Sequence, residues 1–403
     1  MKKLFIAAAV MAICSCAQTP DGLLHVSPPK AGMDPAKLCR VDSVILKSIS
    51  EGNIPGAVLA VVRGDKIVYL KAYGNKQVVP DTVAMTVNTV FDMASVSKCV
   101  GTTLSFMTLV ERGQVLLDDD VKRYIPEFAP WTDPATGEKV EITVRDLMTH
   151  SSGLPPYLNV KAVAERFGEP CPDSTMHYIA AELPRRFRPG TDYTYSCLNF
   201  VTLQNILQRI TGERLCDYAQ REVFDALGLK HTCYLPKNRE DVLPLVAPTE
   251  VQEDGLPLLG DVHDPLARRL NGGNSGNAGV FSSAEDLAVI AAALMNGGEI
   301  NGRRILGPQT VRAMATVPED NAPHIGRALG WDMRSSSSGI KGDMMSRDAT
   351  LCHTGYTGTS MVIDLDSRTA VILLTNRCHP TDSGALYRVR AAVANIVAGS
   401  IED

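Results

Sequence analysis

Two pairs of strand-like segments, one near each end of the chain, constrain its fold most. The first pair, residues 57–62 and 67–72, is split by an Arg-Gly-Asp-Lys segment typical of a hairpin turn. The second pair, residues 359–363 and 369–375, lies near the other end of the chain. Since the segments between the two pairs are mostly helical in pattern, we expect a sheet that is assembled from both ends of the chain.

Several segments between the strand pairs have the apolar spacing of a helix. The clearest is residues 95–112, where apolar side chains recur on one face before Gly113. Further helices are expected at residues 143–150, 199–211, 215–227, 283–295 and 383–398. The pattern predicts one domain of the α+β class, an α/β sandwich, over residues 35–403 with a helical insertion at roughly 113–280.

Charge and composition exclude some functions. The 403 residues carry a net charge of −5, and 45% of them are hydrophobic. This balance is typical of a globular protein with a large core, and no basic cluster favours nucleic acid. We therefore expect no nucleic-acid partner.

The N-terminus has the pattern of a targeting segment. Lys2 and Lys3 precede an apolar run, residues 4–13, which is shorter than the ~20 residues that a membrane-spanning helix needs. The Ile-Cys-Ser-Cys segment that follows resembles a bacterial lipoprotein cleavage box, with Cys16 as the lipidated residue. The alternative is plain secretion with cleavage near Ala17.

The lipoprotein interpretation gives the chain three parts. Residues 1–16 are the signal, the polar and proline-containing residues 17–34 are a tether, and the domain follows. The mature protein is then expected in the cell envelope, on the periplasmic or extracellular side, and attached to the membrane by its lipid alone.

Cysteines and histidines give no metal site. The eight cysteines of the body lack the spacing of a zinc box, and the histidines lack ligand spacing such as HExxH. An envelope protein can form disulfides, but the spacing of these cysteines predicts no pairing, and we expect most of them in the core. No metal or cofactor is implied.

Ser95 and Lys98 form a candidate nucleophile and base. Residues three apart share one face of a helix, so the hydroxyl and the amine can touch. Lysine can take the serine proton only if its pKa is lowered by burial or by nearby positive charge. The chain repeats the same spacing at Ser338 and Lys341, in a Ser/Gly-rich stretch, so the spacing alone is weak evidence.

Two later motifs strengthen the first. Residues 195–197 read Tyr-Ser-Cys, and residues 353–355 read His-Thr-Gly. In this order, the three motifs resemble those of the superfamily of serine β-lactamases, penicillin-binding proteins and family VIII esterases, and are most similar to its class C-like branch. Supporting resemblance lies in residues 142–154 and 276–283.

The resemblance implies a fold and a set of roles. The fold is β-lactamase-like, with an antiparallel sheet flanked by helices and a helical subdomain. Ser95 attacks a carbonyl, and Lys98 and Tyr195 share the proton. The backbone N–H groups of Ser95 and Tyr356 form the oxyanion hole. The expected substrate-binding residues are His353, Thr354, Gly355 and Cys197.

Two motif positions depart from the family pattern. Cys197 replaces an asparagine, and Asn199, two residues further along a helix, is expected to face elsewhere. His353 replaces a lysine, and a partly charged histidine holds a carboxylate more weakly. The sequence therefore favours a serine hydrolase that acts on small esters or on peptides containing D-amino acids, such as cell-wall fragments.

Two other functions stay open. One is a class C-like β-lactamase, and the other is a sensor or scaffold that is acylated by penicillins without turnover. The sequence also leaves open whether His263 and Asp264 form a hydrogen-bonded loop pair or line the cleft.

Overall fold

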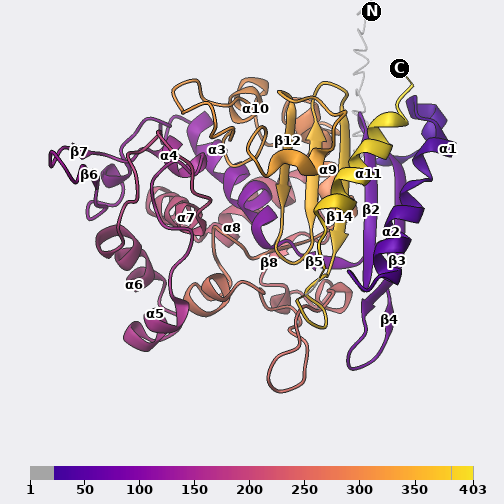
Figure 1. Ribbon diagram of the computed structural model, residues 1–403, viewed down its shortest axis with the longest axis horizontal. Helices are drawn as coiled ribbons and strands as arrows, with labels where there is room; N and C mark the ends of the chain where they lie inside the picture. The colour runs from indigo at the N-terminus through magenta and orange to yellow at the C-terminus, as the bar shows by residue number, and fades with distance from the viewer. Residues whose placement is uncertain (1–21, 383, 403) are drawn as a thin grey trace, which may run out of the picture.

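The computed structural model describes residues 22–382 and 384–402 (Figure 1). The predicted signal, with Cys16, lies outside the described residues. Within the described part of the chain, no helix has the length and apolar character needed to cross a membrane.

The main sheet joins the two ends of the chain. Its strands follow the order β1-β3-β2-β14-β13-β12, and β4 also pairs with β3. The central partners, β2 and β14, are antiparallel, so the N-terminal hairpin and the late strands form one sheet as predicted. Among the described strands of this sheet, only β1 pairs in parallel, with β3. The strand bounds are β1 Leu24–His25, β2 Gly56–Arg63, β3 Lys66–Gln77, β4 Val83–Ala84, β12 Thr350–Thr354, β13 Ser360–Asp364 and β14 Thr369–Thr375.

Helices cover both faces of this sheet (Figure 1). In β2, Val58 and Ala60 belong to the core on the side of α9 (Ala284–Met295), whereas Leu59 and Val61 belong to the core on the side of α2 (Val41–Ser50) and α11 (Tyr387–Gly399). Successive side chains of a strand point to opposite faces, so burial of both faces explains the continuous apolar run of β2.

A helix-rich region lies beside the sheet, on the left of Figure 1. It is continuous with the core on the α9 side. Its helices are α3 Leu104–Glu111, α4 Val144–Met148, α5 Val160–Phe167, α6 Pro172–His177, α7 Cys197–Thr211 and α8 Leu215–Ala219.

The remaining elements are short. Helices α1 Pro35–Leu38 and α10 Pro308–Met314 lie outside that region of the sequence, and a small sheet has the order β5-β9-β8. The remaining strands are β5 Val90–Asp92, β6 Trp131–Thr132, β7 Lys139–Val140, β8 Cys233–Tyr234, β9 Val280–Ser283, β10 Glu299–Ile300 and β11 Arg303–Arg304.

Two segments differ from the sequence prediction. The described part of the predicted tether packs on the domain, because β1 extends the main sheet and Met33 is fully buried. The predicted helix 95–112 is a succession of a 3-10 turn (Ala94–Val96), a π-helical stretch (Lys98–Thr103) and α3. Ordinary α-helical spacing cannot distinguish these helix types.

Candidate active site

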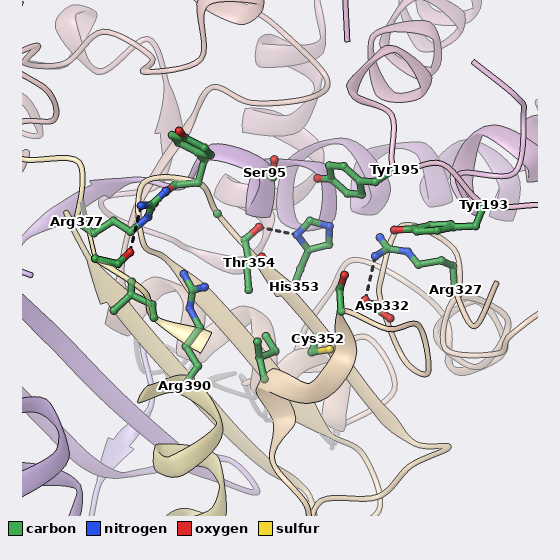
Figure 2. A pocket seen from close by; sticks show the side chains of 16 residues that line it. Ser95, Tyr193, Tyr195, Arg327, Asp332, Cys352, His353, Thr354, Arg377 and Arg390 are labelled. Carbon is green, nitrogen blue, oxygen red and sulfur yellow. Dashed lines mark hydrogen bonds and ion pairs between the residues drawn. The ribbon is translucent and has the colours of Figure 1, made fainter. Parts of the chain in front are cut away.

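Two adjoining cavities meet at Ser95. The first, of about 630 Å³, includes Arg327, Arg377 and Arg390 in its lining, and we call it the arginine cavity (Figure 2). The second, of about 430 Å³, is lined by Cys197 and by residues of the loop around Asp264, and we call it the cysteine cavity. Three residues line both cavities, namely Ser95, Tyr195 and Tyr356.

Ser95 sits on a strained turn after strand β5. The preceding residue, Ala94, has a φ of 44°, which lies in the left-handed region. Its N–H donates to Oδ1 of the buried Asp92 at 2.8 Å. Strain of this kind costs about 1–3 kcal/mol and persists only where surrounding contacts hold it. The turn presents Ser95 to both cavities.

Lys98 is fully buried and uses all three of its ammonium protons. Nζ donates to Ser95 Oγ at 2.9 Å, to the backbone carbonyl of Asn277 at 2.9 Å and to Cys197 Sγ at 3.5 Å. The predicted contact between serine and lysine is therefore present.

The resting protonation of this cluster differs from the prediction. Burial alone would lower the pKa of Lys98. The electrostatic interactions of Lys98 with Cys197 and Tyr195 outweigh this effect, so its pKa is raised. Burial raises the pKa of Tyr195 and of Cys197, although the Lys98 charge opposes both shifts. At neutral pH the cluster thus holds an ammonium, a phenol and a thiol. The expectation that a competent Lys98 has a lowered pKa does not hold for this resting state.

Tyr195 closes the floor of the site. Its ring centroid lies 5.0 Å from Lys98 Nζ, 4.5 Å from the ring of His150 and 5.9 Å from the ring of His353. Its buried hydroxyl has no hydrogen-bond partner among the described residues. The phenol is thus available to a substrate atom or to the serine.

His150 packs against the ring of Tyr195. Its Nδ1 accepts from the backbone N–H of Ser196 at 3.1 Å and lies 3.2 Å from Asn199 Nδ2. Burial lowers the pKa of His150 well below its usual value, and the charges of Arg327 and Lys98 add to the effect. Asn199 therefore faces His150, which agrees with the prediction that it does not replace the missing amide.

His353 is a neutral acceptor, which corrects the prediction of a partly charged ring. Burial, together with the charges of Arg327 and Lys98, lowers the pKa of His353 well below its usual value. Nδ1 lies 2.9 Å from the carbonyl oxygen of Thr354, and since a carbonyl only accepts, Nδ1 carries the proton. Nε2 is then a buried lone pair that has no partner among the described residues. Nε2 can accept a hydrogen bond from a donor group, but it cannot hold a carboxylate.

The turn after β12 is fastened to the segment that precedes Ser95. Thr357 Oγ1 donates to the carbonyl of Asp92 at 2.7 Å, and Thr359 Oγ1 donates to that of Met93 at 3.0 Å. Gly355 lies at this contact, where a Cβ atom would stand 2.4 Å from the Met93 oxygen. Only glycine permits this approach, and the residue that follows it, Tyr356, lines both cavities together with Ser95.

The His263 and Asp264 pair lines the cysteine cavity. Asp264 accepts from Tyr157 Oη at 3.0 Å and from Asn277 Nδ2 at 3.1 Å, while the His263 ring stacks on Tyr356 at 5.6 Å. Of the two interpretations left open by the sequence, the structure therefore selects the cleft.

The second serine–lysine pair does not form a site. Lys341 Nζ donates to the carbonyl oxygens of Met333 at 2.6 Å and Arg347 at 2.9 Å, and Ser338 Oγ donates to that of Ser335 at 2.8 Å. Both side chains thus hold a loop together.

Sequence reasoning missed an arginine in the site. Arg327, from the loop before β12, reaches under Tyr195 with its guanidinium carbon 5.8 Å from the ring centroid, and it pairs with Asp332 (Figure 2). The segment around it has no motif that could have identified it. In the described part of the chain, no cluster of His, Cys, Asp and Glu could hold a metal ion.

Comparisons with known proteins agree with this geometry. Residues 35–395 match the family described as Beta-lactamase. A protein of Escherichia coli (strain K12) named "Putative D-alanyl-D-alanine carboxypeptidase" is 30% identical over 392 residues, which cover 92% of this chain and 89% of that protein.

Two solved structures share the fold. EstCE1, described as a hydrolase with promiscuous acyltransferase activity, superposes with a TM-score of 0.71 at 24% identity and covers 90% of this chain and 99% of its own. Unliganded simvastatin synthase from Aspergillus terreus superposes with a TM-score of 0.66 at 22% identity, with coverage of 90% and 99%. The chain is a serine hydrolase with a β-lactamase-like fold, and it belongs to the Beta-lactamase family.

Proposed function

We propose that this protein hydrolyses small esters or peptides containing D-amino acids through an acyl-enzyme on Ser95. The observation that carries the proposal is the hydrogen bond of 2.9 Å between Ser95 Oγ and the buried Lys98 Nζ, beneath an unpartnered Tyr195 hydroxyl. A serine hydroxyl and two groups that could move its proton lie at the junction of two cavities, which supports the proposal.

The reactive form has one proton fewer than the resting cluster. An ammonium that donates to Ser95 Oγ cannot also accept the serine proton. Once Lys98 or Tyr195 has lost a proton, that group can accept the proton of Ser95 during attack. The two groups titrate as a coupled pair, so the missing proton belongs to the cluster.

Acylation then follows in balanced steps. Ser95 Oγ bonds to the substrate carbonyl carbon, the cluster takes the serine proton, and the carbonyl oxygen becomes an oxyanion. The backbone N–H groups of Ser95 and Tyr356 receive this charge, and one such donor contributes about 3–4 kcal/mol to transition-state stabilisation. The bond to the leaving group breaks as the leaving atom takes the proton. A water molecule then attacks the acyl carbon in the same way. The bond to Ser95 Oγ breaks, the serine regains its proton, and the acid is released.

Three features support an ester or D-peptide substrate over a penicillin. Cys197 offers a thiol where the family motif has an amide, and its Sγ already accepts from Lys98. His353 is neutral and its open nitrogen is an acceptor, so it offers no charge to hold a β-lactam carboxylate. A relative with 30% identity carries the carboxypeptidase name.

We also propose that the mature protein works in the cell envelope, on the periplasmic or extracellular side, with a lipid on Cys16. The basic and apolar N-terminal pattern supports this location. Cys16→Ser should shift the protein from the detergent-extracted membrane fraction to the soluble fraction. Retention in the membrane fraction would contradict the lipid anchor.

Covalent labelling tests the nucleophile. A fluorophosphonate probe should label the wild-type protein and the control Ser338→Ala, but not Ser95→Ala. Undiminished labelling of Ser95→Ala would reject the assignment.

Turnover tests the substrate. We expect p-nitrophenyl acetate or a D-Ala-D-Ala peptide to be hydrolysed faster than nitrocefin. The reverse order would indicate a β-lactamase, and labelling without any turnover would indicate a sensor.

A further inference from the structure

The arginine cavity contains a buried guanidinium whose hydrogen bonds are incomplete. The Arg327 side chain is only 2% exposed, and Nη1 lies 3.4 Å from Oδ2 of Asp332, which is itself 4% exposed. Asp332 Oδ2 also accepts from Ser335 Oγ at 2.5 Å. Among the described residues, Arg327 Nε and Nη2 have no partner. A buried charge with unmade hydrogen bonds is costly, so its retention here calls for a ligand.

The unpartnered atoms identify the ligand. Nε and Nη2 lie on the same side of the planar guanidinium and point two N–H groups in parallel, which matches the two oxygens of a carboxylate. Nη1, on the other side, is occupied by Asp332. The half of Arg327 left unpartnered is therefore the half that binds a carboxylate in bidentate fashion. Figure 2 shows the guanidinium beside Tyr193 and facing the cavity that contains Ser95.

The other candidates for this role are weaker. His353 is a neutral ring whose open nitrogen is an acceptor, so it repels a carboxylate. Arg377 is paired with Asp382 at 2.6 Å. Arg390 also has a buried Nε without a partner among the described residues, but its Nη2 already donates to the carbonyl of Thr359 at 3.0 Å, so its Nε and Nη2 fork is partly used. Arg327 thus presents the better carboxylate site.

The location of Arg327 indicates which part of the substrate carries the charge. Its guanidinium packs against the ring of Tyr195, at 5.8 Å from the centroid. In the proposed mechanism Tyr195 belongs to the cluster that returns a proton to the leaving atom. The acyl group stays bonded to Ser95 and can occupy the cysteine cavity, which meets the arginine cavity at that serine.

We propose that Arg327 is the specificity-determining residue for substrates whose leaving group carries a carboxylate, and that this carboxylate binds the Nε and Nη2 fork. The inference rests on the proposed function, and it replaces His353 with Arg327 as the carboxylate anchor. The substrate class is then an acylated amino acid or hydroxy acid with a free carboxylate. The balanced step is unchanged: Ser95 takes the acyl group, and the leaving amine or hydroxyl departs with its proton and its carboxylate.

Two matched ester pairs test this assignment. In the first pair the leaving group is charged or neutral: 3-acetoxybenzoate and its methyl ester. In the second pair the acyl group is charged or neutral: mono-p-nitrophenyl glutarate and p-nitrophenyl valerate. We expect the wild type to favour 3-acetoxybenzoate over its methyl ester in kcat/KM by about 10- to 100-fold, the range for a hydrogen-bonded charge. The second pair should show no such preference.

Variants test which residue causes the preference for a charged leaving group. Arg327→Met should reduce it to about one, and Arg327→Lys, which keeps the charge but loses the fork, should retain only part of it. Arg327→Met combined with Asp332→Asn removes both charges, which serves as the second variant if the single change impairs folding. Arg334→Met is the matched control, because Arg334 is a half-exposed arginine of the same loop and is paired with Asp348. It should keep the wild-type preference.

Each contrary outcome is decisive. The proposal is overturned if the wild type shows no preference, if Arg327→Met keeps it, if Arg390→Met abolishes it while Arg327→Met does not, or if only the glutarate pair shows it. Failure of the proposed function looks different. In that case neither ester pair is turned over and Ser95 is not labelled by the fluorophosphonate.

Discussion

Replacing Gly355 by alanine should disable the site through backbone geometry alone. An added Cβ would stand 2.4 Å from the Met93 carbonyl oxygen and 2.1 Å from Thr359 Oγ1, whereas ordinary contact begins at 3.4 Å. The backbone segments that carry Ser95 and Tyr356 must therefore separate by about 1 Å, and the hydrogen bond from Thr359 to Met93 must break. Overpacking of this kind costs about 1–3 kcal/mol of stability.

The catalytic effect should exceed the effect on stability. A displacement of about 1 Å between reacting groups can lower the rate by about 100-fold. We expect kcat for p-nitrophenyl acetate to fall by about that factor, with a lower melting temperature measured by circular dichroism. The control is Gly399→Ala, because a Cβ there meets only Met344 Cε at 3.4 Å. The reasoning is refuted if Gly355→Ala keeps kcat within about threefold of the wild type.

Three further predictions concern titratable groups. First, kcat/KM should rise with pH above neutrality, by up to about tenfold per pH unit. The raised pKa values of Lys98 and Tyr195 mean that the resting cluster holds one proton more than the reactive form. A flat pH profile would contradict this. Second, His150 and His353 are buried with lowered pKa values, so the stability they contribute is present above pH 6.5 and is lost as pH falls, by about 1.4 kcal/mol per pH unit for each ring; urea unfolding at pH 7 and pH 5.5 measures this, and equal stabilities would count against it. Third, Cys197→Asn should retain or improve amide turnover, and thiol reagents should impair the wild type but not this variant, since Cys197 lines the cavity beside Lys98; wild-type activity that survives alkylation would oppose it.

The sheet and the arrangement of the candidate site were predictable because each depends on local patterns. The apolar runs of β2 and β14 predicted strands, and the i, i+3 spacing of Ser95 and Lys98 predicted their contact. The motif order then placed Tyr195 and residues 353–355 around them.

The charges of the site could not be predicted from local sequence. His353 is neutral because it is buried and because the charges of Arg327 and Lys98, from distant segments, add to that effect. Lys98 stays charged because its interactions with Cys197 and Tyr195, from another segment, outweigh its burial. Both effects depend on tertiary contacts between segments far apart in the chain. Arg327 was missed for the same reason, because only its burial distinguishes it from the surface arginines.

The central claim is that Ser95 carries the acyl group during turnover. Acid quenching of the enzyme during hydrolysis of p-nitrophenyl acetate, followed by tandem mass spectrometry of its peptides, tests this most directly. The account predicts an acetyl group on Ser95 that is absent from Ser95→Ala. Steady turnover with no acylated Ser95, or with the acetyl group on Cys197 or Tyr195 instead, would contradict it.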